Sequence, residues 1–83
     1  MAVGCVEWAV RPNEGASNGI QAKGTTDLND CMEACLDDAQ CVGFDFDTRQ
    51  SPATCWNHLE QNDFEDIRED KGVILYMLRA KCS

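Results

Sequence analysis

The sequence predicts a small α+β domain held together by disulfides, and three observations carry this prediction. The chain has 83 residues, 43% hydrophobic and 27% charged, which is a globular composition with room for one core. It contains six cysteines, an even number that in a small domain indicates three disulfides and an oxidising compartment. Its hydrophobic pattern alternates in some segments and follows a helical period in another. We therefore expect a single domain over residues 1–83, with its core between Cys5 and Cys82.

The first part of the chain is predicted to hold one strand followed by a loop. Residues 3–10 alternate, with Trp8 on one face and Cys5 on the other, which indicates a strand. Residues 11–24 contain three glycines, a proline and an Asn-Gly pair, all of them typical of turns. This segment is expected to be a loop, with a short strand around residues 20–22.

The next segment predicts the one helix. Thr26 or Asp27 can cap its start, and the apolar stripe continues to about Asp38. The spacing of i, i+3, i+4, i+7 and i+8 places two cysteines one turn apart on the buried face. The residues of this stripe are Leu28, Cys31, Met32, Cys35 and Leu36.

The strand predicted after the helix alternates strictly over residues 41–47. Phe44 and Phe46 point to one side of it, and Asp45 and Asp47 to the other, as expected of a strand with one buried face. The following residues contain a Ser-Pro pair and are expected to form a hairpin-type loop.

The last part of the chain is predicted to hold two strands separated by a loop. Residues 55–59 resume the strand pattern. Residues 60–72 are acidic and polar, with only Phe64 and Ile67 as apolar anchors, so a long surface loop is expected. The continuous apolar run of residues 73–82 predicts a central strand buried on both faces.

The predicted elements also suggest how the cysteines pair, although six cysteines allow fifteen pairings. Cys35 ends the helix and Cys41 opens the next strand, so a short turn can join them. Cys5 and Cys82 lie on the two terminal strands, and a bridge between them would tie the ends of the domain together. The remaining bridge, Cys31–Cys55, would then link the helix to a neighbouring strand.

The distribution of charge excludes several kinds of partner. The net charge is −8, and residues 27–70 carry thirteen acidic side chains against only Arg49 and Arg68. Binding to a nucleic-acid backbone needs clustered basic residues, so no nucleic-acid partner is expected. No apolar run approaches the ~20 residues that span a bilayer, so no membrane insertion is expected.

Several short motifs together resemble those of a PAN/apple module. Cys41-Val-Gly-Phe-Asp-Phe and Cys55-Trp-Asn-His are the most specific of them, and the spacing of the six cysteines supports them. The family fold is an antiparallel sheet of about five strands cradling one α-helix. Family members pair their six cysteines first with sixth, second with fifth and third with fourth. The resemblance therefore implies the same three bridges, Cys5–Cys82, Cys31–Cys55 and Cys35–Cys41.

The resemblance also implies a function. PAN/apple modules occur, often in tandem, in plasma proteases, in growth factors and in parasite microneme adhesins, where they bind proteins or carbohydrates and catalyse nothing. We therefore expect a non-catalytic extracellular adhesion module, without a cofactor, that recognises a protein or a neutral carbohydrate. Members that bind heparin carry basic patches, which the acidic centre of this chain lacks, so sulfated glycans are not expected as ligands.

The surroundings of the module and its role leave alternatives open. Residues 1–4 contain no secretory leader, so we expect the domain to be one unit of a larger secreted or cell-surface protein. A cytosolic protein with reduced thiols is the alternative. The alternative to a ligand-binding role is a structural spacer or self-association module.

Three residues are candidates for contact with a ligand. Trp8 and Trp56 are the side chains best able to stack on a sugar or anchor a protein, although in so small a domain either could be core. His58 follows Cys55 closely, which suggests a thiol–imidazole pair. Nucleophilic catalysis needs a free thiolate, which a bridged Cys55 cannot supply, so His58 is interpreted as a strand residue packing beside the sheet.

No metal site is expected from the spacing of the possible ligand residues. Cys31, Cys35 and Cys41 with His58 lack the short CxxC-type spacing of structural zinc sites. Calcium loops need oxygen ligands at fixed offsets with a turn glycine, and residues 63–70 show no such pattern. A solvated acidic face is the expectation for the other acidic residues considered, which are Asp45, Asp47, Asp63, Glu65, Asp66, Glu69 and Asp70.

Overall fold

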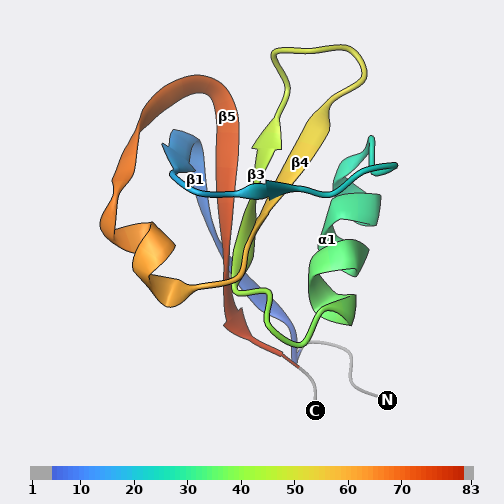
Figure 1. Cartoon of the computed structure of the whole chain (residues 1–83), viewed down its shortest axis with the longest axis vertical. Helices are drawn as coiled ribbons and strands as arrows, with labels where there is room; N and C mark the ends of the chain where they lie inside the picture. The colour runs from blue at the N-terminus through green and yellow to red at the C-terminus, as the bar shows by residue number, and fades with distance from the viewer. Residues whose placement is uncertain (1–4, 82–83) are drawn as a thin grey trace.

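The computed structural model describes residues 5–81 of the chain. It contains one α-helix, a short 3-10 helix and five strands (Figure 1). In chain order these are β1 (Glu7–Ala16), β2 (Ile20–Gln21), α1 (Leu28–Asp37), β3 (Gly43–Asp47), β4 (Thr54–His58), η1 (Gln61–Glu65) and β5 (Ile67–Ala80).

The five strands form one antiparallel sheet in the order β1-β5-β3-β4-β2. The predicted α+β fold, a disulfide-linked sheet of about five strands with one helix, is confirmed. The predicted interior position of the last strand is confirmed as well, because β5 lies between β1 and β3. Tyr76 is buried on one face of β5, and Val73 and Leu75 are buried on the other.

The helix is capped and attached as its sequence predicts. The Asp27 side chain accepts a hydrogen bond from the Asp30 N–H at 2.8 Å, which satisfies a backbone donor at the first turn. Cys31 and Cys35 are fully buried. Cys31 is joined to Cys55 of β4 and Cys35 to Cys41 just before β3, with Cα separations of 5.9 and 5.2 Å. The helix is therefore linked covalently to one face of the sheet, called the inner face below.

An aromatic cluster fills the core beside the helix. Phe44 stacks on Tyr76 with ring centroids 4.9 Å apart and an interplanar angle of 10°. Trp8 meets both rings edge-on, at 5.3 Å from Phe44 and 6.3 Å from Tyr76. Aromatic pairs favour such offset and edge-to-face arrangements over face-to-face sandwiches. The alternating aromatic residues of β3 thus point inward, as predicted.

The structure shows why the motif that begins at Cys41 has a glycine at position 43. A Cβ atom at this position would lie 2.8 Å from Phe64 Cζ and 3.2 Å from Met77 Cα, and closer still to the Tyr76 carbonyl oxygen. Two of these atoms belong to the backbone of β5 and cannot move independently of the sheet. The close approach of β3 to β5 at this point therefore requires a glycine.

Two predicted loops are shorter than expected, because regular structure occupies much of each segment. The segment 11–24 was expected to be a loop with a short strand around residues 20–22. β2 confirms the short strand, but β1 continues to Ala16. The segment 60–72 was also expected to be a loop, but it forms η1 and the first part of β5. The distal part of β1 pairs with the start of β5, Gly15 opposite Arg68 and Ala16 opposite Ile67. Figure 1 shows β5 curving over at this end of the molecule.

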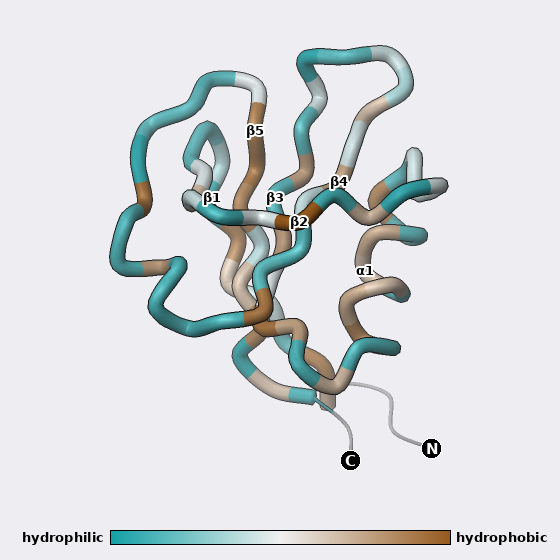
Figure 2. The backbone as a smooth tube through the Cα atoms, in the orientation of Figure 1, coloured by the Kyte–Doolittle hydropathy of each residue, from teal (hydrophilic) through white to brown (hydrophobic). Residues whose placement is uncertain are grey.

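The sequence pattern did not indicate this pairing because the paired residues are mostly polar and flank a β-bulge at Asn13. The register shifts between Pro12 and Glu14, where Asn13 adopts a left-handed φ of 62°. The Asn13 side chain accepts a hydrogen bond from the Gly72 N–H at 3.2 Å, so turn residues stabilise a bulge here instead of ending the strand. Figure 2 shows that this curved part of the chain is largely hydrophilic, which is why an apolar pattern did not indicate it.

The second face of β3 also differs from its prediction. Asp45 and Asp47 were expected on a solvated face, yet they are only 8% and 7% exposed. Alternation along the strand places them opposite the helix, on the outer face of the sheet. The end of β1 covers this face, because the Ala16 N–H lies 3.4 and 3.3 Å from the two carboxylate oxygens of Asp45. A Cβ atom added at Gly15 would lie in van der Waals contact with both Val73 and Asp45. Burial of these carboxylates defines the candidate site.

Candidate functional site

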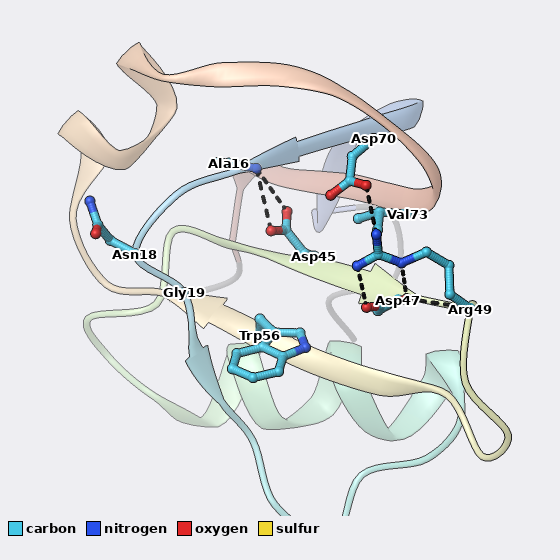
Figure 3. Close-up of a pocket in the computed structure, with 9 residues that line it drawn as sticks. All are labelled: Ala16, Asn18, Gly19, Asp45, Asp47, Arg49, Trp56, Asp70 and Val73. Carbon is cyan, nitrogen blue, oxygen red and sulfur yellow. Dashed lines mark hydrogen bonds and ion pairs between the residues drawn. The ribbon is translucent and has the colours of Figure 1, made fainter.

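A pocket of about 290 Å³ opens on the outer face of the sheet (Figure 3). β3 supplies its floor, β4 supplies an aromatic wall, and the ends of β1 and β5 supply the opposite wall. Three carboxylates, one guanidinium and one indole line it together with smaller groups. The lining residues are Ala16, Asn18, Gly19, Asp45, Asp47, Arg49, Trp56, Asp70 and Val73.

Arg49 holds one side of the pocket by binding two aspartates. Its Nε and Nη2 atoms donate to the two carboxylate oxygens of Asp47 at 3.0 and 2.8 Å, and its Nη1 donates to Asp70 at 2.9 Å (Figure 3). Two parallel bonds between a guanidinium and a carboxylate fix both groups in one orientation. The hydrogen bonds from Arg49 outweigh the effect of burial and lower the pKa of Asp47. This pair therefore remains ionised through the neutral pH range.

Asp45 belongs to a second, deeper group with His58 and Asp63. His58 is fully buried, and its Nδ1 lies 2.9 Å from Asp63 Oδ2 of η1. Its Nε2 lies 3.2 Å from Asp45 Oδ2, within ion-pair distance but not aligned for a hydrogen bond. Burial lowers the pKa of His58, but its contacts with Asp45 and Asp63 outweigh burial and raise that pKa above its ordinary value. The imidazole is therefore poised to carry a positive charge between two carboxylates.

Trp56 is fixed as one wall of the pocket. It faces Asp45 directly across the β3–β4 pair, and its Nε1 donates to Thr54 Oγ1 at 3.1 Å. The indole is half-buried, so part of its surface is open to a ligand. Figure 3 shows the ring on the same side of the sheet as the carboxylates.

The structure separates the three ligand candidates named from the sequence. Trp56 lines the pocket, whereas Trp8 packs against the aromatic cluster on the inner face. His58 is not among the residues that line the pocket, and it contacts the lining residue Asp45 from behind. The sequence did not identify Arg49 as a pocket residue. Its guanidinium links Asp47 to Asp70, and Asp70 lies 21 residues further along the chain. The spacing Asp47-x-Arg49 was the one local signal that could have indicated the pair.

The expectation of a solvated acidic face is therefore wrong for three of the seven acidic residues. Asp45, Asp47 and Asp63 are buried, and their compensating partners are Arg49 and His58. Buried charges persist where they are paired, which explains how these side chains leave water. Across residues 5–81, no group of three or more His, Cys, Asp or Glu side chains is arranged to hold a metal ion.

The predicted cysteine pairing can be compared with the structure at two bridges. Cys31–Cys55 and Cys35–Cys41 lie within the described residues as disulfides. The third predicted bridge, Cys5–Cys82, involves Cys82, which lies outside them. None of the helices in the described range is long and apolar enough to cross a membrane.

The described residues thus form a small disulfide-linked α+β fold with a pocket on the outer face of its sheet. The chain belongs to the PAN domain family, because the family model described as PAN domain matches residues 10–82. The resemblance drawn from the motifs is thereby confirmed. PAN domains are generally non-catalytic modules of adhesion and binding proteins, typical of extracellular proteins, and they bind proteins or carbohydrates. No curated protein sequence matches the chain.

Proposed function

We propose that residues 1–83 form one non-catalytic, extracellular binding module that recognises a protein or a neutral carbohydrate through the pocket beside Trp56. The observation that carries this proposal is the pocket itself, where a half-exposed indole stands beside fixed polar groups. Ligand sites commonly combine an apolar or aromatic wall with a few polar groups that set orientation. Family membership supports the class of function, and the pocket supports this location for the ligand.

A non-catalytic role is supported by the state of the nucleophile and base candidates. Cys55 is bridged to Cys31, so it offers no thiolate. His58 is fully buried and cannot reach a substrate. Disulfides also support an oxidising, extracellular environment, in which we expect the module to stand in tandem with other domains of a larger protein.

A self-association module receives less support. Among the described residues, the large apolar side chains that are exposed are Val10 and Ile20. They lie on β1 and β2, the opposite edges of the sheet, and do not form one apolar patch. Contiguous apolar surface is what marks most protein self-association sites.

The test is a glycan array combined with capture of extracellular proteins, each run with the wild-type module and with Trp56→Ala. Retention by the wild-type module and loss in the variant supports binding at this pocket. Retention that is equal in both proteins places the ligand elsewhere. Sedimentation at high concentration provides the third arm, since self-association without any captured ligand would contradict the proposal.

A further inference from the structure

We propose that the Trp56 pocket binds a basic side chain, lysine or arginine, presented by a partner protein. This inference rests on the proposed function, because it names the ligand class of the same site. Three features carry it: the excess negative charge of the pocket, the buried carboxylate of Asp45, and the position of the Trp56 indole.

The charged groups of the pocket do not balance. Asp45, Asp47 and Asp70 line the pocket with one cation, Arg49. His58 lies behind Asp45 and is shared with Asp63, so even a charged His58 leaves four carboxylates against two cations. Arg49 is already engaged, because its Nε, Nη1 and Nη2 atoms each donate to Asp47 or Asp70. The pocket therefore keeps an excess negative charge that its own residues do not neutralise. Chain-wide charge acts in the same direction, since the net charge is −8.

The Asp45 carboxylate is the pocket group that an added hydrogen-bond donor would stabilise most. Asp45 is only 8% exposed, yet it lines the pocket. The donors that reach it are weak: the Ala16 N–H lies 3.4 and 3.3 Å from its two oxygens, and His58 Nε2 is not aligned for a hydrogen bond. A buried carboxylate normally accepts several short hydrogen bonds or pairs with a cation. Asp45 shares its one cation, His58, with Asp63 and accepts no short hydrogen bond, so a cationic donor in the pocket would add the short, aligned bond that this carboxylate lacks.

Trp56 adds a second kind of attraction for the same ligand. The face of an indole attracts ammonium and guanidinium groups through its quadrupole, more strongly than other aromatic rings do. The hydrogen bond from its Nε1 to Thr54 restrains the ring beside the carboxylates. An aromatic wall beside excess carboxylates is complementary to a cation with an aliphatic stem, whose methylene groups can also pack on the ring.

A neutral sugar fits this set of groups less well. Sugar hydroxyls both donate and accept, but the strongest donor of the pocket, Arg49, already binds two carboxylates. A neutral ligand would also leave the excess charge uncompensated within a partly dehydrated site. An anionic ligand is repelled by the same charge.

The experiment titrates the protein with Nα-acetyl-lysine amide and with Nα-acetyl-arginine amide, monitored by the NMR shift of the Trp56 indole N–H. Nα-acetyl-norleucine amide is the matched probe, since it keeps the aliphatic stem without the charge. Galactose is the neutral-sugar probe. We expect a saturable shift with one or both cationic probes, at least tenfold weaker binding of norleucine, and weaker cation binding as NaCl rises from 50 to 300 mM.

Three variants test whether the cationic probes bind at this pocket. Asp70→Asn removes a partly exposed carboxylate of the pocket, and Asp45→Asn removes the buried one. Each should weaken cation binding at least fivefold. Asp37→Asn makes the same charge change on the exposed side of α1 and should alter binding less than twofold. Because Asp70 is partly exposed, its variant keeps the test valid if Asp45→Asn does not fold.

The results separate this inference from the proposed function. If galactose shifts the indole signal and the cationic probes do not, the inference is wrong and the binding module stands. Equal binding of lysine and norleucine probes, or equal effects of Asp70→Asn and Asp37→Asn, would also overturn it. If none of these probes binds and neither glycan nor protein is captured, both the inference and the proposed function fail.

Discussion

His58 and Asp63 are five residues apart in the chain, and their Nδ1 and Oδ2 atoms meet at 2.9 Å inside the protein. The second ring nitrogen of His58 faces Asp45 at 3.2 Å. A neutral imidazole can donate from one nitrogen only, whereas the imidazolium donates from both. The site is therefore best satisfied when His58 is charged. The Phe64 ring meets the imidazole edge-on, with ring centroids 5.5 Å apart.

This arrangement predicts that stability falls as pH rises through neutrality. The pKa of His58 is raised in the folded protein, so its contribution is fully present below the unfolded pKa of about 6.5. It is lost as pH rises through the folded pKa. Urea unfolding between pH 5.5 and 9 should show a decreasing free energy of unfolding. Since the chain has one histidine, His58→Gln should abolish most of this slope, and a slope unchanged in that variant would contradict the assignment.

Gly43→Ala should be clearly destabilising. The added Cβ would meet the backbone of β5 at Tyr76 and Met77, and the Phe64 ring. Overpacking of this kind typically costs about 1–3 kcal/mol, and the upper part of that range is expected because the obstacle is backbone. Gly15→Ala is the matched control, since a Cβ atom added there would lie 3.4–3.6 Å from its nearest neighbours, which is ordinary van der Waals contact. Thermal or urea unfolding of the two variants should differ by about 1 kcal/mol or more; similar losses would show that β3 can shift.

Truncation of the two tryptophans should affect stability and ligand binding to different degrees. Trp8 contacts Phe44 and Tyr76 in the core, so Trp8→Ala should cost about 3 kcal/mol of unfolding free energy. Trp56 lies at the pocket, and Trp56→Ala should cost only about 1 kcal/mol while removing ligand binding. Urea unfolding gives the first comparison and the binding assays the second. Comparable destabilisation by both variants would show that Trp56 is chiefly a core residue.

The helix and the central strands could be predicted because their signals are local. An apolar stripe with a capping aspartate defines α1, and strict alternation defines β3. The same alternation misled at Asp45 and Asp47, since a charged residue on one face of a strand normally indicates water. Their burial depends on His58, Arg49 and the curved ends of β1 and β5, which no local pattern brings together. The site was therefore less predictable than the fold.

The two disulfides of the helix should contribute unequally to stability. In the chain-entropy model, the Cys31–Cys55 bridge, with a sequence separation of 24, contributes about 3–4 kcal/mol. The Cys35–Cys41 bridge, with a separation of 6, contributes about 2 kcal/mol. The longer bridge also joins α1 to β4 across the core, so its loss opens the packing between helix and sheet, whereas the shorter one closes a local turn. We therefore expect Cys31→Ala/Cys55→Ala to lower the free energy of unfolding by at least 1 kcal/mol more than Cys35→Ala/Cys41→Ala.

Peptide mapping of the unreduced protein should first establish the pairing, including the proposed Cys5–Cys82 bridge. Equal or reversed losses in urea unfolding of the two double variants would show that the turn before β3, rather than attachment of the helix to β4, limits the stability of the module.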